Sequence, residues 1–248
     1  MSTTLSTVGL SIRDRLDDLT LTIHGGEVTA ICGPNGAGKS TLLTCLAGLQ
    51  DPDIGIAALG TRVMHEIPAR QRAQCIGYLP QSPEVAWDVT VEVLVGLGRL
   101  PWHDAATSQG AATIDAAIAT MDLEALRKRP VSRLSGGERA RALMARVLST
   151  GPAWILADEP LANLDLGHAI ALMRRLREQA NHGRGVVLVL HDLATAMNYA
   201  DRVIVLDRGR VVADGEPCHA LSEAVIRQTW DCPARWLGEP GSRALALG

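Results

Sequence analysis

The sequence predicts an α/β protein with a mostly parallel sheet, into which an all-helical segment is inserted. Short apolar runs recur along the chain and alternate with stretches whose apolar residues have helical spacing. Such alternation is typical of a parallel sheet covered by helices on both faces. Residues 89–148 depart from it, because their apolar residues have almost only helical spacing. The apolar runs that we expect to be strands of this sheet are 28–32, 154–157, 186–190 and 203–206.

The composition is that of a folded protein with an aliphatic core. The chain has 248 residues, of which 47% are hydrophobic and 21% charged, so extended disorder is excluded. Only 3% are aromatic and none is Phe, so the core has to be built from Leu, Val, Ile and Ala. The net charge of −3 gives no electrostatic reason to expect a nucleic-acid partner.

Three further features indicate a cytoplasmic protein. The longest apolar runs, such as 186–190, are far shorter than the roughly 20 residues that span a bilayer. The first residues lack the basic and apolar regions of a secretion signal. The five cysteines are odd in number and form no C-x-x-C pair, which indicates small core or surface residues in a reducing compartment and neither a disulfide framework nor a zinc site.

The first 79 residues predict strands, a turn and a helix in a clear order. Residues 5–23 alternate as strands do, a turn at 24–27 leads to strand 28–32, and a glycine-rich loop opens a helix. The apolar residues of this helix are Leu42, Leu43, Leu46 and Leu49, and a short strand follows at Tyr78 and Leu79.

After the helical segment, strands and helices alternate again. Arg208 and Gly209 predict a hairpin turn near the end of this region. We therefore expect a single domain, in which 1–88 and 149–248 form the α/β core and 89–148 form the helical subdomain.

The glycine-rich loop predicts a phosphate-binding site. It matches G-x-x-x-x-G-K-[ST] in full and lies between an apolar strand and a helix. Glycines let successive N–H groups converge on phosphate oxygens, and the helix N-terminus adds a favourable dipole. A purely structural turn is the alternative, but the position between strand and helix favours ATP binding by Gly33, Pro34, Asn35, Gly36, Ala37, Gly38, Lys39, Ser40 and Thr41.

Two carboxylates end the apolar run that begins at Trp154. Asp158 and Glu159 should lie at the carboxyl edge of the sheet, where ligands bind in open α/β folds. In a phosphoryl-transfer site, Asp158 would hold Mg²⁺ together with Ser40, and Glu159 would polarise the attacking water. A solvated acidic turn is the alternative. His191 follows another apolar run and is expected to begin the next helix at the same edge, with a structural or capping role as the alternative.

A second anion-binding helix end is predicted at 134–138. Glycines at the start of a helix expose amides to anions, although a simple capping box would explain the Ser and the Glu equally well. One phosphate loop already accounts for one nucleotide, so a second such loop needs its own explanation. The segment consists of Leu134, Ser135, Gly136, Gly137 and Glu138.

The order of these motifs resembles that of the ATP-binding cassette (ABC) ATPases, from about residue 5 to 215. Two further elements of the pattern are present. Gln81 follows a short strand between the phosphate loop and residues 134–138, and the pair Leu164 and Asp165 lies between Glu159 and His191. The resemblance implies a RecA-like P-loop NTPase core, an N-terminal antiparallel β subdomain, and two chains paired head to tail around two MgATP. Residues 134–138 then form the signature segment of the family, which binds the partner's ATP, and Asp165 lies in the D-loop across the dimer.

The resemblance also assigns roles within one chain. Gln81 would sense Mg²⁺ and a transmembrane partner, and His191 would be the γ-phosphate switch. The implied catalytic residues are Lys39, Gln81, Glu159 and His191, and the implied Mg²⁺ ligands are Ser40, Gln81 and Asp158.

A narrower resemblance concerns the importers of iron-siderophores, haem and cobalamin. It is carried by residues 69–73, 78–81, 89–102 and 135–146. It implies a homodimer on the cytoplasmic face of the inner membrane, bound to a permease dimer that a periplasmic binding protein supplies. The alternatives are an importer of another substrate, an exporter, a cassette that only regulates, or a soluble ABC ATPase of DNA repair or translation.

The sequence departs from the family pattern at two positions where the family contacts the nucleotide. No aromatic residue stands near the end of the first strand, where Arg13 is the substitute that we expect to stack on adenine. Ala140 replaces a Gln that often follows the signature. Permease contacts are expected between Gln81 and Trp102, with Val85, Trp87 and Trp102 as candidates for exposed anchors; the alternative is that these Trp residues belong to the core. The segment after Gly215 has helical pieces and no identifiable chemistry.

Overall fold

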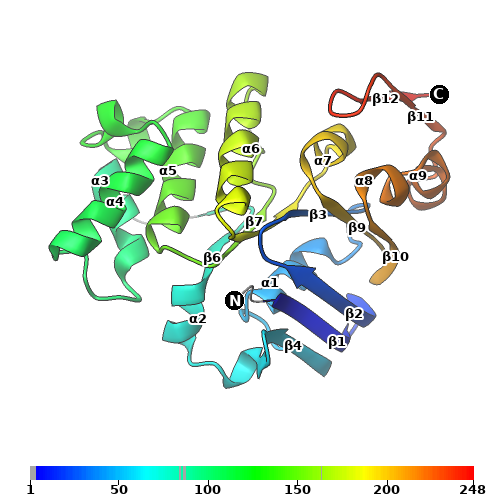
Figure 1. The fold of residues 1–248 in the computed structure, drawn as a ribbon, viewed down its shortest axis with the longest axis horizontal. Coiled ribbons are helices and arrows are strands. Elements are labelled where there is room, and N and C mark those ends of the chain that lie inside the picture. The colour runs from blue at the N-terminus through cyan, green and yellow to red at the C-terminus, as the bar shows by residue number, and fades with distance from the viewer. Residues whose placement is uncertain (1–3, 84, 86–87, 163) are drawn as a thin grey trace.

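A six-stranded sheet forms the centre of the computed structural model, which describes residues 4–83, 85, 88–162 and 164–248 (Figure 1). The strand order is β10-β9-β3-β8-β7-β6, and every neighbouring pair is parallel except β9 and β10. All residues of β3, β7 and β8 are buried, as expected for strands that helices cover on both sides. The strands are β3 (Val28–Cys32), β6 (Ile76–Leu79), β7 (Trp154–Asp158), β8 (Gly185–Val189), β9 (Arg202–Asp207) and β10 (Arg210–Gly215).

The predicted hairpin is confirmed between β9 and β10. Its two turn residues, Arg208 and Gly209, both have positive φ, 47° and 78°. Positive φ at both central residues is what the tight hairpin turns that match strand twist require.

A second, antiparallel sheet contains the N-terminal strands. Its order is β2-β1-β4-β5; over most of their length β1 alternates buried with half-buried residues and β2 alternates buried with exposed residues. The predicted strand pattern of residues 5–23 is therefore confirmed, whereas β4 and β5 were not predicted. The strands are β1 (Thr4–Ile12), β2 (Leu16–His24), β4 (Ile54–Leu59) and β5 (Arg62–Val63).

Helix α1 (Lys39–Leu46) joins the two sheets into one core. Leu42, Leu43 and Leu46 are fully buried and pack with residues of both sheets. The prediction that Leu49 belongs to the apolar face of this helix is wrong. The helix ends at Leu46, Gly48 then adopts a positive φ of 67°, and Leu49 is 62% exposed.

The inserted segment is helical, as predicted, and lies to one side of the sheet (Figure 1). Helices α3 (Val91–Gly96), α4 (Ser108–Thr120) and α5 (Gly136–Ser149) bury Leu94, Ile118 and Met144 against one another. Single 3₁₀ turns complete it at Leu97–Arg99, Glu124–Leu126 and Val131–Arg133. The fold class is thus the predicted one, a P-loop NTPase sheet with an antiparallel β subdomain and a helical insert.

The remaining elements surround the sheet. Helix α2 (Ala69–Cys75) follows a 3₁₀ turn at Met64–Glu66, and α6 (Leu166–Asn181) and α7 (Leu193–Tyr199) contact the sheet strands. The C-terminal segment was expected to hold helical pieces, and α8 (Pro217–Ala220) and α9 (Glu223–Trp230) are these. It also holds an unpredicted hairpin of β11 (Ala234–Leu237) and β12 (Ala244–Leu247).

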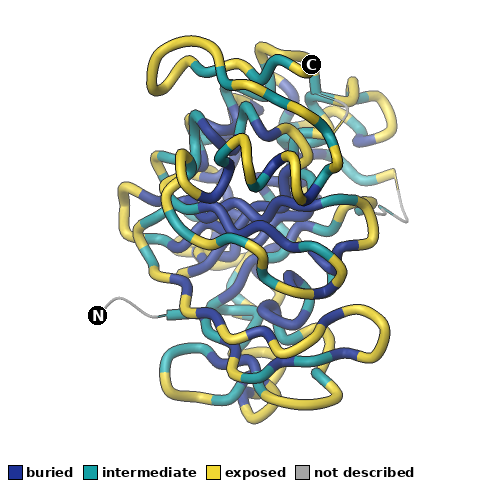
Figure 2. Tube along the Cα trace, turned by 90° about the vertical axis from the view of Figure 1, so that its right-hand side faces the viewer, coloured by how far each residue is buried: buried dark blue, intermediate teal, exposed yellow. Residues whose placement is uncertain are grey.

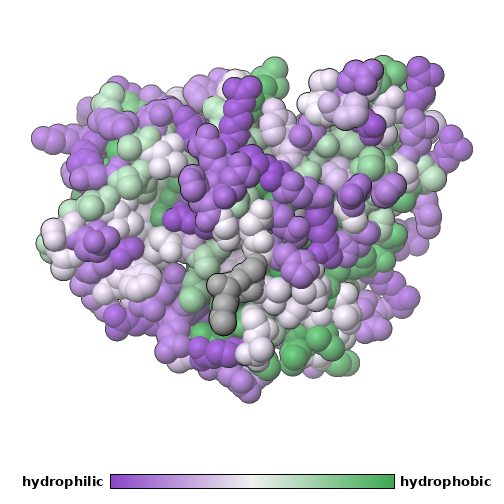
Figure 3. All heavy atoms as spheres, in the orientation of Figure 1, coloured by the Kyte–Doolittle hydropathy of each residue, from purple (hydrophilic) through white to green (hydrophobic). Residues whose placement is uncertain are grey.

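Burial is concentrated in the central sheet and the layers next to it, and the loops at both ends are exposed (Figure 2). The face shown in Figure 3 is mainly hydrophilic, with apolar residues scattered over it. Among the described residues, no helix combines the length and apolar character that crossing a membrane requires. All five cysteines are free thiols, as predicted.

Candidate nucleotide-binding site

The phosphate loop connects β3 to α1 and closes around a buried lysine. Gly36 and Gly38 have φ of 81° and 99°, a region that side chains with a Cβ rarely adopt. Lys39 is 6% exposed, and its Nζ donates hydrogen bonds of 2.9 Å to the carbonyl oxygens of Gly33 and Pro34. Burial lowers the pKa of Lys39, an effect that the nearby Glu159 opposes.

Asp158 offers a buried oxygen that no protein group satisfies. It is the last residue of β7, it is 3% exposed, and its Oδ1 has no hydrogen-bond partner among the described residues. Burial raises the pKa of Asp158, and the nearby Ser40 hydroxyl counteracts that shift. A buried carboxylate oxygen without a donor, beside a hydroxyl, suits a hard cation with oxygen ligands. The two residues therefore fit Mg²⁺.

Glu159 and His191 form a pair at the carboxyl edge of the sheet. Glu159 has a φ of 51°, uncommon for a residue with a side chain, and its N–H donates to the carbonyl of Val189 at the end of β8 (3.2 Å). Nε2 of His191 lies 2.5 Å from Oε1 of Glu159. The prediction that His191 begins the next helix is wrong. Asp192 is the N-cap of α7, which starts at Leu193.

One cavity of about 530 Å³ connects the sheet edge to the helical subdomain. Asp158, Glu159 and Gln81 line it from the sheet side, and Gly136 and Arg139 line it from the start of α5. The structure thus brings together the carboxylates, Gln81 and the first signature glycine within one chain.

The signature segment forms a complete capping box at the start of α5. The N–H of Glu138 donates to Oγ of Ser135 (3.3 Å), and Oε2 of Glu138 accepts from the N–H of Ser135 (2.8 Å). The hydrogen bond from the Ser135 backbone lowers the pKa of Glu138. Ser135 and Gly136 are exposed, whereas Leu134 and Gly137 are half-buried. The capping role considered from the sequence is therefore real, and it fixes the helix end while leaving Gly136 open.

The start of α6 lies beside the signature helix. Asp165 is the N-cap of α6 and accepts from the N–H of His168 (2.9 Å), while Nδ1 of His168 lies 2.8 Å from Oδ2 of Asp165. A Cβ added to Gly137 would meet the ring of His168 at 3.4 Å, so the ring lies next to this part of the signature segment. Leu164 is half-buried and packs against the core. Sequence reasoning missed His168, because only the fold brings it next to Gly137.

A separate hollow of about 920 Å³ lies next to the exposed end of the phosphate loop, where a nucleotide base would be held. Its lining contains Gly36 and three arginines but no aromatic residue. Arg13 is exposed, and its backbone N–H donates to Oδ2 of Asp53 (2.7 Å). The sequence singled out Arg13 alone; Arg15 and Arg208 join it because the β1–β2 and β9–β10 turns meet here.

The candidate permease contacts differ in exposure. Val85 is half-buried and packs against the helical core, and Trp87 lies outside the described residues. Trp102 is 39% exposed, its Nε1 donates to the Thr150 carbonyl (2.8 Å), and the Arg99 guanidinium lies 5.2 Å from its ring centroid. Trp102 is therefore fixed in place and still accessible.

The fold and the site define a class of protein. A glycine-rich loop between a parallel strand and a helix, with a lysine at the loop and two carboxylates at the end of another strand of the same sheet, is the architecture of a P-loop nucleotide-binding protein.

Comparison with known proteins places the chain within this class. A sequence profile of the family described as "ABC transporter" matches residues 16–162. The chain is 44% identical over 229 residues to the hemin import ATP-binding protein HmuV of Rhodococcus jostii, covering 92% of this chain and 78% of that protein. It is 40% identical to HmuV of Streptomyces coelicolor, covering 97% and 86%.

A solved structure agrees with this placement. The dimeric post-hydrolysis state of an ATP-binding cassette bound to ADP and Pi superimposes with a TM-score of 0.78 at 25% identity, covering 86% of this chain and 98% of that one. The chain belongs to the ABC transporter family and is one of its ATP-hydrolysing subunits.

Proposed function

We propose that this chain is the energy-coupling ATPase of an importer for haem or a related iron chelate. The observation that carries the proposal is that Lys39, Asp158, Glu159 and His191 are all present and lie around one phosphate loop, so the chain has the groups for hydrolysis as well as binding. The 40% and 44% identities to hemin import ATP-binding proteins over nearly the whole chain favour haem over the siderophores and cobalamin.

The roles of the residues follow from their positions. Lys39, already aimed into the loop, would bind the β- and γ-phosphates together with the amides of 33–41. Ser40, Asp158 and Gln81 would hold Mg²⁺, which neutralises phosphate charge when bound. Glu159 would take up a proton from the attacking water, and His191 would orient Glu159. Catalysis is then mainly positioning and charge stabilisation.

The signature segment would bind the partner's ATP in a head-to-tail homodimer. Ser135 and Gly136 are exposed at the N-terminus of a fourteen-residue helix, a favourable place for an anion. In the proposed dimer these groups bind the partner's ATP, and His168 links them to Asp165 of the D-loop. The dimeric cassette with ADP and Pi supports this arrangement.

A groove beside the helical subdomain would receive the permease on the cytoplasmic face of the membrane. It has a volume of about 560 Å³, and exposed apolar residues line it. Leu49 and Leu100 are each 62% exposed, and Leu97 is 36% exposed, a concentration that is unusual on a polar surface. A short amphipathic helix of an integral membrane protein would cover these side chains. The permease would in turn be supplied by a substrate-binding protein on the outer side.

The test is uptake of labelled haem by the host organism with the chromosomal copy of this gene disrupted. Restoring the wild-type chain should restore uptake, while restoring Glu159→Gln should not. Uptake of haem that is unaffected by the disruption, with loss of siderophore-bound iron or cobalamin uptake instead, would move the proposal to that substrate. If the disruption affects none of the three, the proposed import function is wrong.

A further inference from the structure

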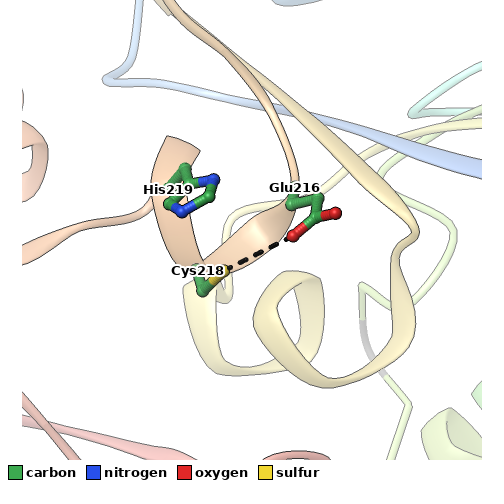
Figure 4. A group of neighbouring side chains, drawn as sticks. All are labelled: Glu216, Cys218 and His219. Atoms are coloured by element: carbon green, nitrogen blue, oxygen red, sulfur yellow. Dashed lines mark hydrogen bonds between the residues drawn. The ribbon is translucent and has the colours of Figure 1, made fainter.

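A group of three potential metal ligands lies on the C-terminal segment, far along the chain from every nucleotide-site motif. Glu216, Cys218 and His219 are exposed and stand at the start of α8 (Figure 4). One carboxylate oxygen, the Sγ and one ring nitrogen all lie within 4.8 Å of one another. We propose that these three side chains bind a divalent transition-metal ion of the Zn²⁺ type.

The distances suit a tetrahedral ion. Sγ of Cys218 lies 3.9 Å from Oε2 of Glu216. Zn–S and Zn–O bonds of about 2.3 and 2.1 Å at tetrahedral angles separate the two ligand atoms by about 3.6 Å. No separation in the group is larger than 4.8 Å, so at most about 1.2 Å has to be closed, which rotation of exposed side chains can supply.

The backbone holds the three residues in this arrangement without a metal. Pro217 occupies the first turn of α8, where its fixed φ favours the helix. The Glu216 carbonyl accepts from the N–H groups of His219 (3.0 Å) and Ala220 (2.9 Å). Ala220 and Leu221 are buried and anchor the turn to the core. Because the backbone is already ordered, binding of the ion costs little conformational entropy, which favours binding.

The ligand types select the metal. A thiolate and an imidazole favour Zn²⁺ and its neighbours in the transition series over Mg²⁺ and Ca²⁺, which prefer oxygen ligands. Three protein ligands leave the fourth position to water or to an external ligand, as in open zinc sites. None of the three side chains forms an ion pair with Lys or Arg among the described residues, so binding of a metal ion would not have to break such a pair.

Titration of the full-length, nucleotide-free protein with Co²⁺ tests the site. A thiolate ligand produces a sulfur-to-cobalt charge-transfer band, which an oxygen-only site such as that around Asp158 cannot produce. We expect the band to saturate at one equivalent of Co²⁺ and to disappear when Zn²⁺ is added. Cys218→Ser should abolish the band, and His219→Ala should weaken Co²⁺ binding roughly tenfold or more.

Cys232→Ser is the matched control, because Cys232 is also partly accessible, lies on the same segment and is outside the group. This variant should bind Co²⁺ as the wild type does. The circular dichroism of all three variants should stay unchanged, because the substituted side chains are not in the core. Absence of the band in the wild type, its persistence in Cys218→Ser, or its equal loss in Cys232→Ser would overturn the proposal. None of these results depends on ATP hydrolysis.

Discussion

Nε2 of His191 lies 2.5 Å from Oε1 of Glu159, although 31 residues separate the two in the chain. Glu159 reaches this position through a backbone with positive φ, and its N–H bonds to Val189, on the strand that leads to His191. The ends of two adjacent parallel strands thus set the geometry of the pair. This is the contact through which a group that orients and a group that accepts a proton would act together.

Glu159→Gln should nearly abolish ATP turnover and leave ATP binding intact. The amide keeps the size of the side chain but cannot take a proton from water, so we expect a loss of roughly 10²–10⁴-fold in kcat. Release of phosphate and equilibrium binding of ATP measure the two effects. The variant should also accumulate as a dimer in gel filtration with MgATP, because the two chains close on ATP and hydrolysis no longer separates them.

Glu178→Gln is the control for that experiment, since Glu178 is exposed on α6, away from the phosphate loop. Its turnover should equal that of the wild type. Near-normal turnover in Glu159→Gln would remove Glu159 from the role of base.

Asp158→Asn should stabilise the nucleotide-free protein while destroying its Mg²⁺-dependent activity. Burial raises the folded-state pKa of Asp158 above its ordinary value of 3.8, so the folded state loses stability as pH rises through that window. Asn carries no charge, so its Tm should exceed that of the wild type at pH 7, and the gain should shrink as pH falls toward 3.8. Thermal unfolding at several pH values measures this; an unchanged or lower Tm at pH 7 would contradict the account.

Arg13→Ala should raise the ATP dissociation constant several-fold. In the absence of an aromatic residue, we expect the Arg13 guanidinium, one of three that line the hollow, to stack on adenine, a contact of about 0.5–1 kcal/mol at an exposed site. Titration with a fluorescent ATP analogue measures the constant. Arg235→Ala, on the exposed part of β11, is the matched control and should bind ATP normally. An unchanged constant in Arg13→Ala would assign the base contact to other residues of the hollow.

Gly98→Ala and Gly96→Ala should shift Tm in different ways. A Cβ at Gly98 would lie 2.2 Å from the Arg146 carbonyl oxygen, a backbone atom that cannot move cheaply, so we expect a loss of about 1–3 kcal/mol. At Gly96 the nearest atom is 3.7 Å away and φ is helical, so Ala should be neutral or stabilise by up to about 1 kcal/mol. Equal effects on thermal unfolding would contradict this view of the α3–α5 contact.

The fold class could be predicted because its signal is local. Apolar runs such as 28–32 and helical spacing such as that of 91–95 are visible within single elements, and the structure confirms both. Strand β4 was not predicted because only two of its six residues are buried and Gly55, near its start, has a positive φ. The β11–β12 hairpin was not predicted because each of its strands has only four residues and the burial of β12 does not alternate.

The candidate site divides in the same way. Residues within contiguous motifs, such as Lys39 and Glu159, could be identified from the sequence alone. Arg15, Arg208 and His168 could not, because each becomes part of the site only through contacts between segments far apart in the chain. The roles of all of these residues in catalysis remain predictions.

Affinity purification of the tagged chain from gently solubilised membranes tests whether the chain is bound to a membrane permease. Mass spectrometry should find a multi-span permease in equal amount, and substitution of Leu100 by Glu in the apolar groove should abolish its recovery while ATP binding persists. Recovery of the chain from the soluble fraction alone, with no integral membrane protein, would contradict the transport function and favour a soluble ABC ATPase.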